Sequence, residues 1–124
     1  MISKQYTCIF YETVHGNTPV EDFIEGLDEK TQNKFIFKKE LLEQFGTKLG
    51  YPHTKNLKNE LFELRLKSIK GQIRIIFFFY LNNFIILVHG FIKKTQKISK
   101  KEILTSKKRR DDFLKRSKWH EKGR

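Results

Sequence analysis

The stretch "LFELRLKSIKGQIRIIFFFYLNNFIILVHGFIKK", residues 61–94, decides the fold. Its first segment, 61–68, alternates apolar and polar residues, which predicts a strand with one buried and one solvated face. The segments 73–81 and 84–92 are apolar at nearly every position, as in central strands that are covered on both faces. The two asparagines between them tolerate positive φ and predict a tight hairpin turn. We therefore expect three consecutive antiparallel strands.

The N-terminal region predicts one more strand and a short helix. "KQYTCIFYETV", residues 4–14, has apolar residues on both alternating sets, which favours a strand with both faces partly covered. Thr18 is suited to cap a helix, because Pro19 stands at its first position and Glu21 follows three residues after the cap. This helix is expected to end near Gly26.

A second, longer helix is predicted over residues 29–45. Asp28 can cap its N-terminus, and the apolar residues recur at three- and four-residue spacings. Gly46 is expected to end this helix in a left-handed turn. The glycine-containing segment 46–59 is expected to be a loop that leads into the strand at 61–68.

The last predicted element is a basic helix over residues 100–116. Ser99 and Glu102 have the spacing of a capping box at its start. The order of elements predicts a single α+β domain, residues 1–116, followed by a frayed tail at 117–124. In this domain an N-terminal strand and a helical hairpin precede a three-stranded antiparallel sheet, and the first strand completes a four-stranded sheet.

The positive charge is concentrated at the C-terminal end. The net charge is +12, yet residues 1–92 hold 12 basic and 10 acidic side chains, whereas residues 93–124 hold 14 basic and 4 acidic ones. Such a distribution favours a polyanionic partner, because lysines and arginines on phosphates release condensed counterions. A solubilising charged tail is the alternative.

The sequence contains no sign of a membrane span, an export signal or a cofactor site. Its apolar runs are shorter than the roughly 20 residues that a bilayer requires, and its start lacks the order of regions typical of a signal peptide. Cys8 is the only cysteine, which excludes an intrachain disulfide and a C-x-x-C pair. We expect a cytoplasmic protein without metal or cofactor.

Four basic residues are expected to meet at one edge of the sheet. Arg65 and Arg74 lie on neighbouring strands, and antiparallel order brings Lys93 and Lys94, at the end of the last strand, beside Arg74. The alternative is that Arg65 pairs with a carboxylate such as Glu63 and that the other three only mark strand ends. The strand register decides between these interpretations.

Residues 60–116 resemble the phage-derived branch of the RelE/ParE superfamily, which includes HigB-like toxins of bacterial type II toxin–antitoxin systems. The resemblance rests on "ELR", "IRIIFF" and "LVHGFIKKTQKISKKEI", in this order and at this spacing. It implies a RelE-like fold and a metal-independent endoribonuclease, an mRNA interferase that cleaves messenger RNA on the ribosome and so inhibits translation. It also implies a HigA-like antitoxin with a helix-turn-helix domain, and a toxin that is monomeric alone and forms a higher-order complex with this partner.

The resemblance also implies roles for the four basic residues. Arg74 corresponds to the family's arginine on strand three, Lys94 or Lys93 to the basic position after strand four, and Arg65 to a basic position on strand two. Guanidinium groups can stabilise charge on a phosphate, and neighbouring cations lower the pKa of a lysine, so that it can transfer protons. The C-terminal tyrosine of RelE-type toxins, which stacks on a base, has no counterpart in residues 93–124.

The basic helix is expected to bind RNA or the ribosome rather than to catalyse. The residues assigned to this role are Lys97, Lys100, Lys101, Lys107, Lys108, Arg109 and Arg110. For His89, inside an apolar strand, we expect a structural role. Two other functions stay open: a ParE-like inhibitor of DNA gyrase on the same fold, and a non-catalytic nucleic-acid-binding protein.

Overall fold

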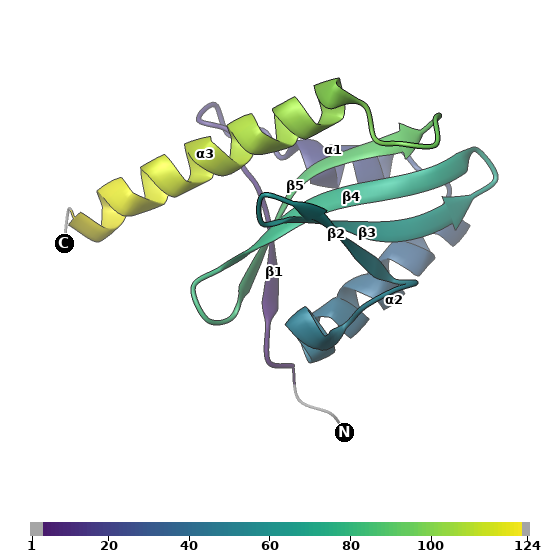
Figure 1. The fold of residues 1–124 in the computed structure, drawn as a ribbon, viewed down its shortest axis with the longest axis horizontal. Coiled ribbons are helices and arrows are strands. Elements are labelled where there is room, and N and C mark those ends of the chain that lie inside the picture. Colours follow the sequence, from purple (N-terminus) through teal and green to yellow (C-terminus); the bar gives the residue numbers. More distant parts are fainter. Residues whose placement is uncertain (1–3, 123–124) are drawn as a thin grey trace.

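The computed structural model describes residues 4–122, which form one mixed sheet and three α-helices (Figure 1). The strand order is β1-β5-β4-β3-β2, with β1 parallel to β5 and all other neighbours antiparallel. This arrangement confirms the predicted α+β class. The elements are β1 (Thr7–Phe10), α1 (Pro19–Glu25), α2 (Glu29–Phe45), the 3₁₀ helix η1 (Gly46–Lys48), β2 (Thr54–Lys58), β3 (Leu61–Ser68), β4 (Gly71–Tyr80), β5 (Phe84–Lys93) and α3 (Lys100–Lys122).

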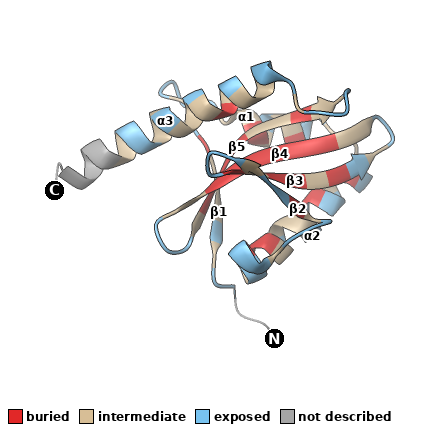
Figure 2. Cartoon of the chain, viewed as in Figure 1, coloured by how far each residue is buried: buried red, intermediate tan, exposed pale blue. Residues whose placement is uncertain are grey.

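The sheet separates two hydrophobic clusters. On one face, Val20 of α1 and Phe35 and Leu42 of α2 pack against one alternating set of strand residues. On the other face, Phe113 of α3 packs against the opposite set, which includes Phe78 of β4. The buried residues follow the central strands (Figure 2), as their apolar composition predicts. Each face of the sheet is therefore covered by helices.

The prediction of a four-stranded sheet was wrong by one strand, because part of the expected loop 46–59 is the edge strand β2. Thr54 pairs with Leu64, and Asn56 pairs with Phe62, before a bulge interrupts the register. The β2 residues are "TKNLK", mostly exposed and polar, so this strand lacks the apolar alternation by which buried strands are recognised. Its pairing with β3 places the preceding loop next to Arg65, whose N–H donates to the His53 carbonyl at 2.9 Å.

The predicted helix limits hold for α2 and need revision for α3. The Asp28 carboxylate accepts the Thr31 N–H at 3.1 Å, which confirms the expected N-cap. Gly46 has a φ of +49°, and a Cβ atom there would lie 2.0 Å from the Tyr6 ring, so glycine is required on two grounds. Helix α3 continues beyond its predicted end at Arg116 to Lys122; the end of the expected frayed tail, 123–124, lies outside the described residues.

Within residues 4–122, no helix is both long and apolar enough to cross a membrane.

Candidate functional site

The strand register brings the two predicted catalytic arginines together. Arg65 on β3 pairs directly with Arg74 on β4, so both side chains lie on the sheet face that carries α3. On the other side of β4, Gln72 pairs with Lys93 at the end of β5, which places Lys93 on the same face. Lys94 follows the strand and is exposed.

These four residues line one open cleft of about 710 Å³ at this end of the sheet. Its remaining walls come from the loop before β2 and from the segment between β5 and α3. We call it the cationic cleft; its lining residues are Tyr51, Arg65, Lys67, Gln72, Arg74, Lys93, Lys94, Thr95 and Gln96.

Arg74, near the start of β4, is almost completely buried. Only 2% of its surface is exposed, and Glu63, on the neighbouring strand β3, is 1% exposed. Glu63 Oε2 lies 3.3 Å from Arg74 Nε and also accepts a hydrogen bond from Arg65 Nη1. The expected solvated face of β3 therefore contains a buried carboxylate that holds both arginines, and the alternative pairing of Arg65 with Glu63 is part of the site.

The Arg74 guanidinium is held in place but not fully paired. Its Nη1 donates to the Ile73 carbonyl at 3.0 Å and weakly to Gln72 Oε1 at 3.4 Å. Its Nε, although within ion-pair distance of Glu63, has no hydrogen-bond partner among the described residues. Burial and then the charge of Arg65 lower the pKa of Arg74, which Glu63 offsets in part. An anion in the cleft would supply the missing negative charge.

Lys93 has the electrostatic setting expected of a residue that transfers protons. Partial burial lowers the pKa of its ammonium group, and the nearby charge of Arg74 lowers it further. A larger fraction of Lys93 is thus neutral near physiological pH than for an isolated lysine.

A second lysine, which the sequence did not single out, approaches the cleft from α2. Lys38 Nζ lies 3.0 Å from His53 Nδ1. Burial, then Arg65 and Arg74, lower the pKa of Lys38, and burial, then Lys38, lowers that of His53. Both groups lie near Arg65, because the chain reversal before β2 folds back against β3. Only the register of β2, which the sequence did not predict, could have revealed this proximity.

The basic residues around α3 fall into two groups. Arg109 Nη1 donates to the Val88 carbonyl at 2.9 Å, and Arg110 donates to the Asn59 carbonyl, so both arginines connect α3 to the rest of the fold. Lys107 is partly buried. The exposed lysines of the set predicted to bind RNA are Lys97, Lys100, Lys101 and Lys108; Lys115, outside that set, is exposed as well. Of the seven residues predicted to bind RNA, these four point most clearly to solvent.

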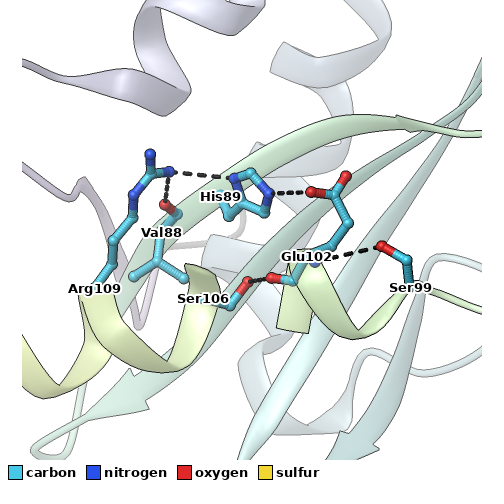
Figure 3. A network of polar contacts seen from close by, with 6 residues as sticks. All are labelled: Val88, His89, Ser99, Glu102, Ser106 and Arg109. Carbon is cyan, nitrogen blue, oxygen red and sulfur yellow. Dashed lines mark hydrogen bonds and ion pairs between the residues drawn. The ribbon is translucent and has the colours of Figure 1, made fainter. Parts of the chain in front are cut away.

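His89 has the structural role that its position predicted. Its Nε2 lies 3.0 Å from Glu102 Oε1, and Arg109 Nη1 lies 3.2 Å from its Nδ1 (Figure 3). Because arginine can only donate, Nδ1 is the acceptor and Nε2 carries the proton. The Val88 carbonyl is available to Arg109 because a bulge in β5 leaves Val88 outside the ladder with β4. His89 thus docks α3 on the sheet and takes no part in the cleft.

Residues 22–111 match the family described as "Phage derived protein Gp49-like (DUF891)". The chain belongs to this family. The match extends from α1 into α3 and includes every residue of the cationic cleft. The Gp49-like proteins are a family of toxin-like proteins, in agreement with the coarser part of the expectation from sequence. A search among curated proteins found no match. No group of three or more histidine, cysteine, aspartate or glutamate side chains that could hold a metal ion occurs in the described part of the chain.

Proposed function

We propose that this Gp49-like protein is the toxin of a type II toxin–antitoxin system, of the HigB-like branch of the RelE/ParE superfamily, and that it cleaves messenger RNA on the ribosome. The observation that supports this most directly is the pairing of Arg65 with Arg74 beside Lys93 in one cleft. Three cations at one sheet end suit a phosphodiester, whereas an inhibitor that binds a protein such as gyrase has no need of them.

The proposed reaction uses the RNA's own 2′-hydroxyl as nucleophile. A bond forms between O2′ and phosphorus while the bond from phosphorus to O5′ breaks, which leaves a 2′,3′-cyclic phosphate and a 5′-hydroxyl. Lys93 in its neutral form accepts the 2′-hydroxyl proton, and a protonated group or water supplies the proton to O5′. The guanidinium groups of Arg65 and Arg74 stabilise the charge that accumulates on the phosphoryl oxygens.

The proposal includes the location and the partners. The toxin acts in the cytoplasm on translating ribosomes, where the exposed lysines around α3 bind ribosomal or messenger RNA. A helix-turn-helix antitoxin neutralises it by covering the cationic surface. The toxin is a monomer by itself and assembles further only with this antitoxin.

Primer extension on transcripts from cells that express the protein tests the proposal. We expect growth arrest together with new 5′ ends in translated transcripts.

Lys93→Gln should slow cleavage by about 10²–10⁴-fold, whereas Lys70→Gln, which removes an exposed lysine from the nearby β3–β4 turn, should have no effect. Lys94→Gln should have a smaller effect than Lys93→Gln, because Lys94 lies beyond the end of β5 and is exposed, so that solvent screens its charge. Intact transcripts together with growth arrest and broken chromosomes would instead indicate gyrase inhibition.

A further inference from the structure

One aromatic side chain at the cationic cleft is largely exposed to solvent. Tyr51 is 75% exposed, compared with 59% for Phe37 and 41% for Phe45. It lines the cleft together with Arg65 and Arg74. The phenol ring thus stands directly beside the groups proposed to bind phosphate.

The loop that carries Tyr51 is anchored on both sides. The Gly50 carbonyl accepts the N–H groups of His53, at 3.0 Å, and of Thr54, at 3.2 Å. The His53 carbonyl accepts the Arg65 N–H at 2.9 Å, which attaches the loop to β3. An exposed ring on an anchored backbone can bind a ligand with little loss of conformational entropy.

The Tyr51 ring is also oriented by a cation. The Arg65 guanidinium carbon lies 5.2 Å from the ring centroid, a cation–π contact that occupies one face of the ring. Because the side chain is largely exposed, its opposite face is accessible to solvent. Arg65 therefore connects two surfaces, an aromatic one at the rim and a cationic one in the cleft.

We propose that Tyr51 is the base-stacking platform of this site, on which a nucleobase of single-stranded RNA stacks while the adjacent phosphate binds in the cationic cleft. This inference rests on the proposed function and names a contact that the resemblance does not supply, because residues 93–124 contain no tyrosine. Stacking uses the face of a base and not its edge, so the platform accepts all four bases and favours the larger purines.

The test is a binding measurement that does not depend on cleavage. The probe is a short, fluorescently labelled 2′-O-methyl RNA, which has no nucleophile, together with an abasic oligomer of equal length and charge. Tyr51→Ala should weaken binding of the 2′-O-methyl RNA by about 5- to 100-fold and leave binding of the abasic oligomer unchanged. Tyr51→Phe should bind as the wild type does, since it retains the ring.

The matched control is Phe37→Ala, which removes another exposed aromatic side chain, on α2 and outside the cleft, and should change neither affinity. Equal losses for both probes in Tyr51→Ala would overturn the inference, because Tyr51 would then act only through Arg65. So would unchanged binding of the RNA, or a wild type that binds neither probe. If the wild type bound RNA through Tyr51 but cleaved no transcript, the proposed function would be contradicted, whereas the inference that a base stacks on Tyr51 would still hold.

Discussion

The buried pair of Glu63 and Arg74 changes what a substitution in this site measures. A lone buried carboxylate is costly, and removal of one partner of a buried ion pair typically destabilises a protein by several kcal/mol. Because both side chains are almost inaccessible to solvent, loss of cleavage in an Arg74→Ala variant would report folding as well as chemistry. Lys93, which is only partly buried, is the better probe of the site.

We expect Arg74→Met to lower the free energy of unfolding by about 3 kcal/mol, near the lower end of the range for buried pairs because Arg65 still contacts Glu63. The double variant Glu63→Gln, Arg74→Met should recover part of this loss, since no buried charge is left unpaired. Urea denaturation at neutral pH measures both. Lys67→Met, at an exposed position of β3, serves as control, and a stable Arg74→Met protein would show that Glu63 does not depend on Arg74.

His89 predicts a dependence of stability on pH. Burial lowers its pKa below 6.5, Glu102 opposes this shift, and Arg109 adds to it. The folded protein therefore binds fewer protons here than the unfolded chain. Its contribution to stability is complete above about pH 6.5 and decreases as the pH falls below this value toward the lowered pKa.

Thermal unfolding between about pH 5.5 and 7.5 tests this expectation. The wild type should lose stability toward the acid end, and His89→Gln should reduce the slope because glutamine does not titrate. The slope that remains belongs in part to His53, whose pKa is also lowered. An identical slope in the His89→Gln variant would exclude His89 as the titrating group.

At the scale of the elements, the sequence predicted the order of helices and strands well, because apolar periodicity and capping residues act locally. It failed where a long-range contact decides the structure. The alternation of β3 correctly assigned Leu64 to the core. It could not reveal that the Glu63 carboxylate is buried in ion pairs with Arg74 and Arg65. The turn between β4 and β5 also differs from the prediction. Its positive φ is at Leu81 and not at the asparagines. The pairing of Tyr80 with Phe84 leaves three residues in the turn, so strand pairing and not the local preference of asparagine decides which residue takes the positive φ.

The candidate site was predictable to the extent that antiparallel order determines neighbours. The strand order placed Arg65, Arg74 and Lys93 at one edge of the sheet, and the register, which the sequence did not predict, placed them on one face. Tyr51 could not be placed in this way, because it reaches the cleft through the position of β2 and the loop before it, in a segment whose composition resembles a simple connection. The approach of Lys38 on α2 to Arg65 was likewise not predictable, because it depends on how that loop folds against β3.

The basic residues of α3 differ in their contacts: several lysines are exposed to solvent, whereas Arg109 and Arg110 donate hydrogen bonds to backbone carbonyls outside the helix. The variant Lys100→Gln, Lys101→Gln, Lys108→Gln should fold as the wild type does and bind RNA with a weaker salt dependence, by a slope of about 0.7 for each lost phosphate contact. Affinity measured across a range of salt concentrations checks this. Removal of the same charge elsewhere, at Lys30, Lys48 and Lys58, is the matched control. Equal slopes for the two triple variants would mean that the α3 lysines form only a solvated face.

Substitution of Arg109 should have a different effect, because its guanidinium bonds the Val88 carbonyl and His89. Its loss is expected to destabilise the docking of α3 and only indirectly to affect RNA.

At the scale of the whole molecule, β1 is the edge strand beside β5 and is attached to α2 by hydrogen bonds. Glu43, at the end of α2, is buried, accepts the Cys8 N–H at 2.9 Å and lies 3.2 Å from Lys4 Nζ. Its backbone carbonyl also accepts the N–H of Tyr6 at 2.9 Å. One glutamate thus connects the N-terminal strand to the helical layer.

Cys8 makes this attachment measurable, because it is the only cysteine of the chain. Burial, with a smaller effect of Glu43, raises the pKa of its thiol from 9.0 to about 12. Since the thiolate is the reactive form, alkylation of Cys8 at pH 8 should be about a thousandfold slower than in an unfolded peptide with a cysteine pKa of about 8.5. Modification should become faster when β1 leaves the sheet, because the thiol then regains the ordinary cysteine pKa. Glu43→Gln should accelerate it about tenfold or more, because a charged hydrogen-bond acceptor contributes about 1.5–3 kcal/mol, whereas Glu40→Gln, at an exposed position of α2, should not. Iodoacetamide labelling followed by mass spectrometry measures the rates. If Cys8 of the wild type reacted as fast as the peptide, β1 would not be held by Glu43, and the N-terminal strand would open independently of the rest of the fold.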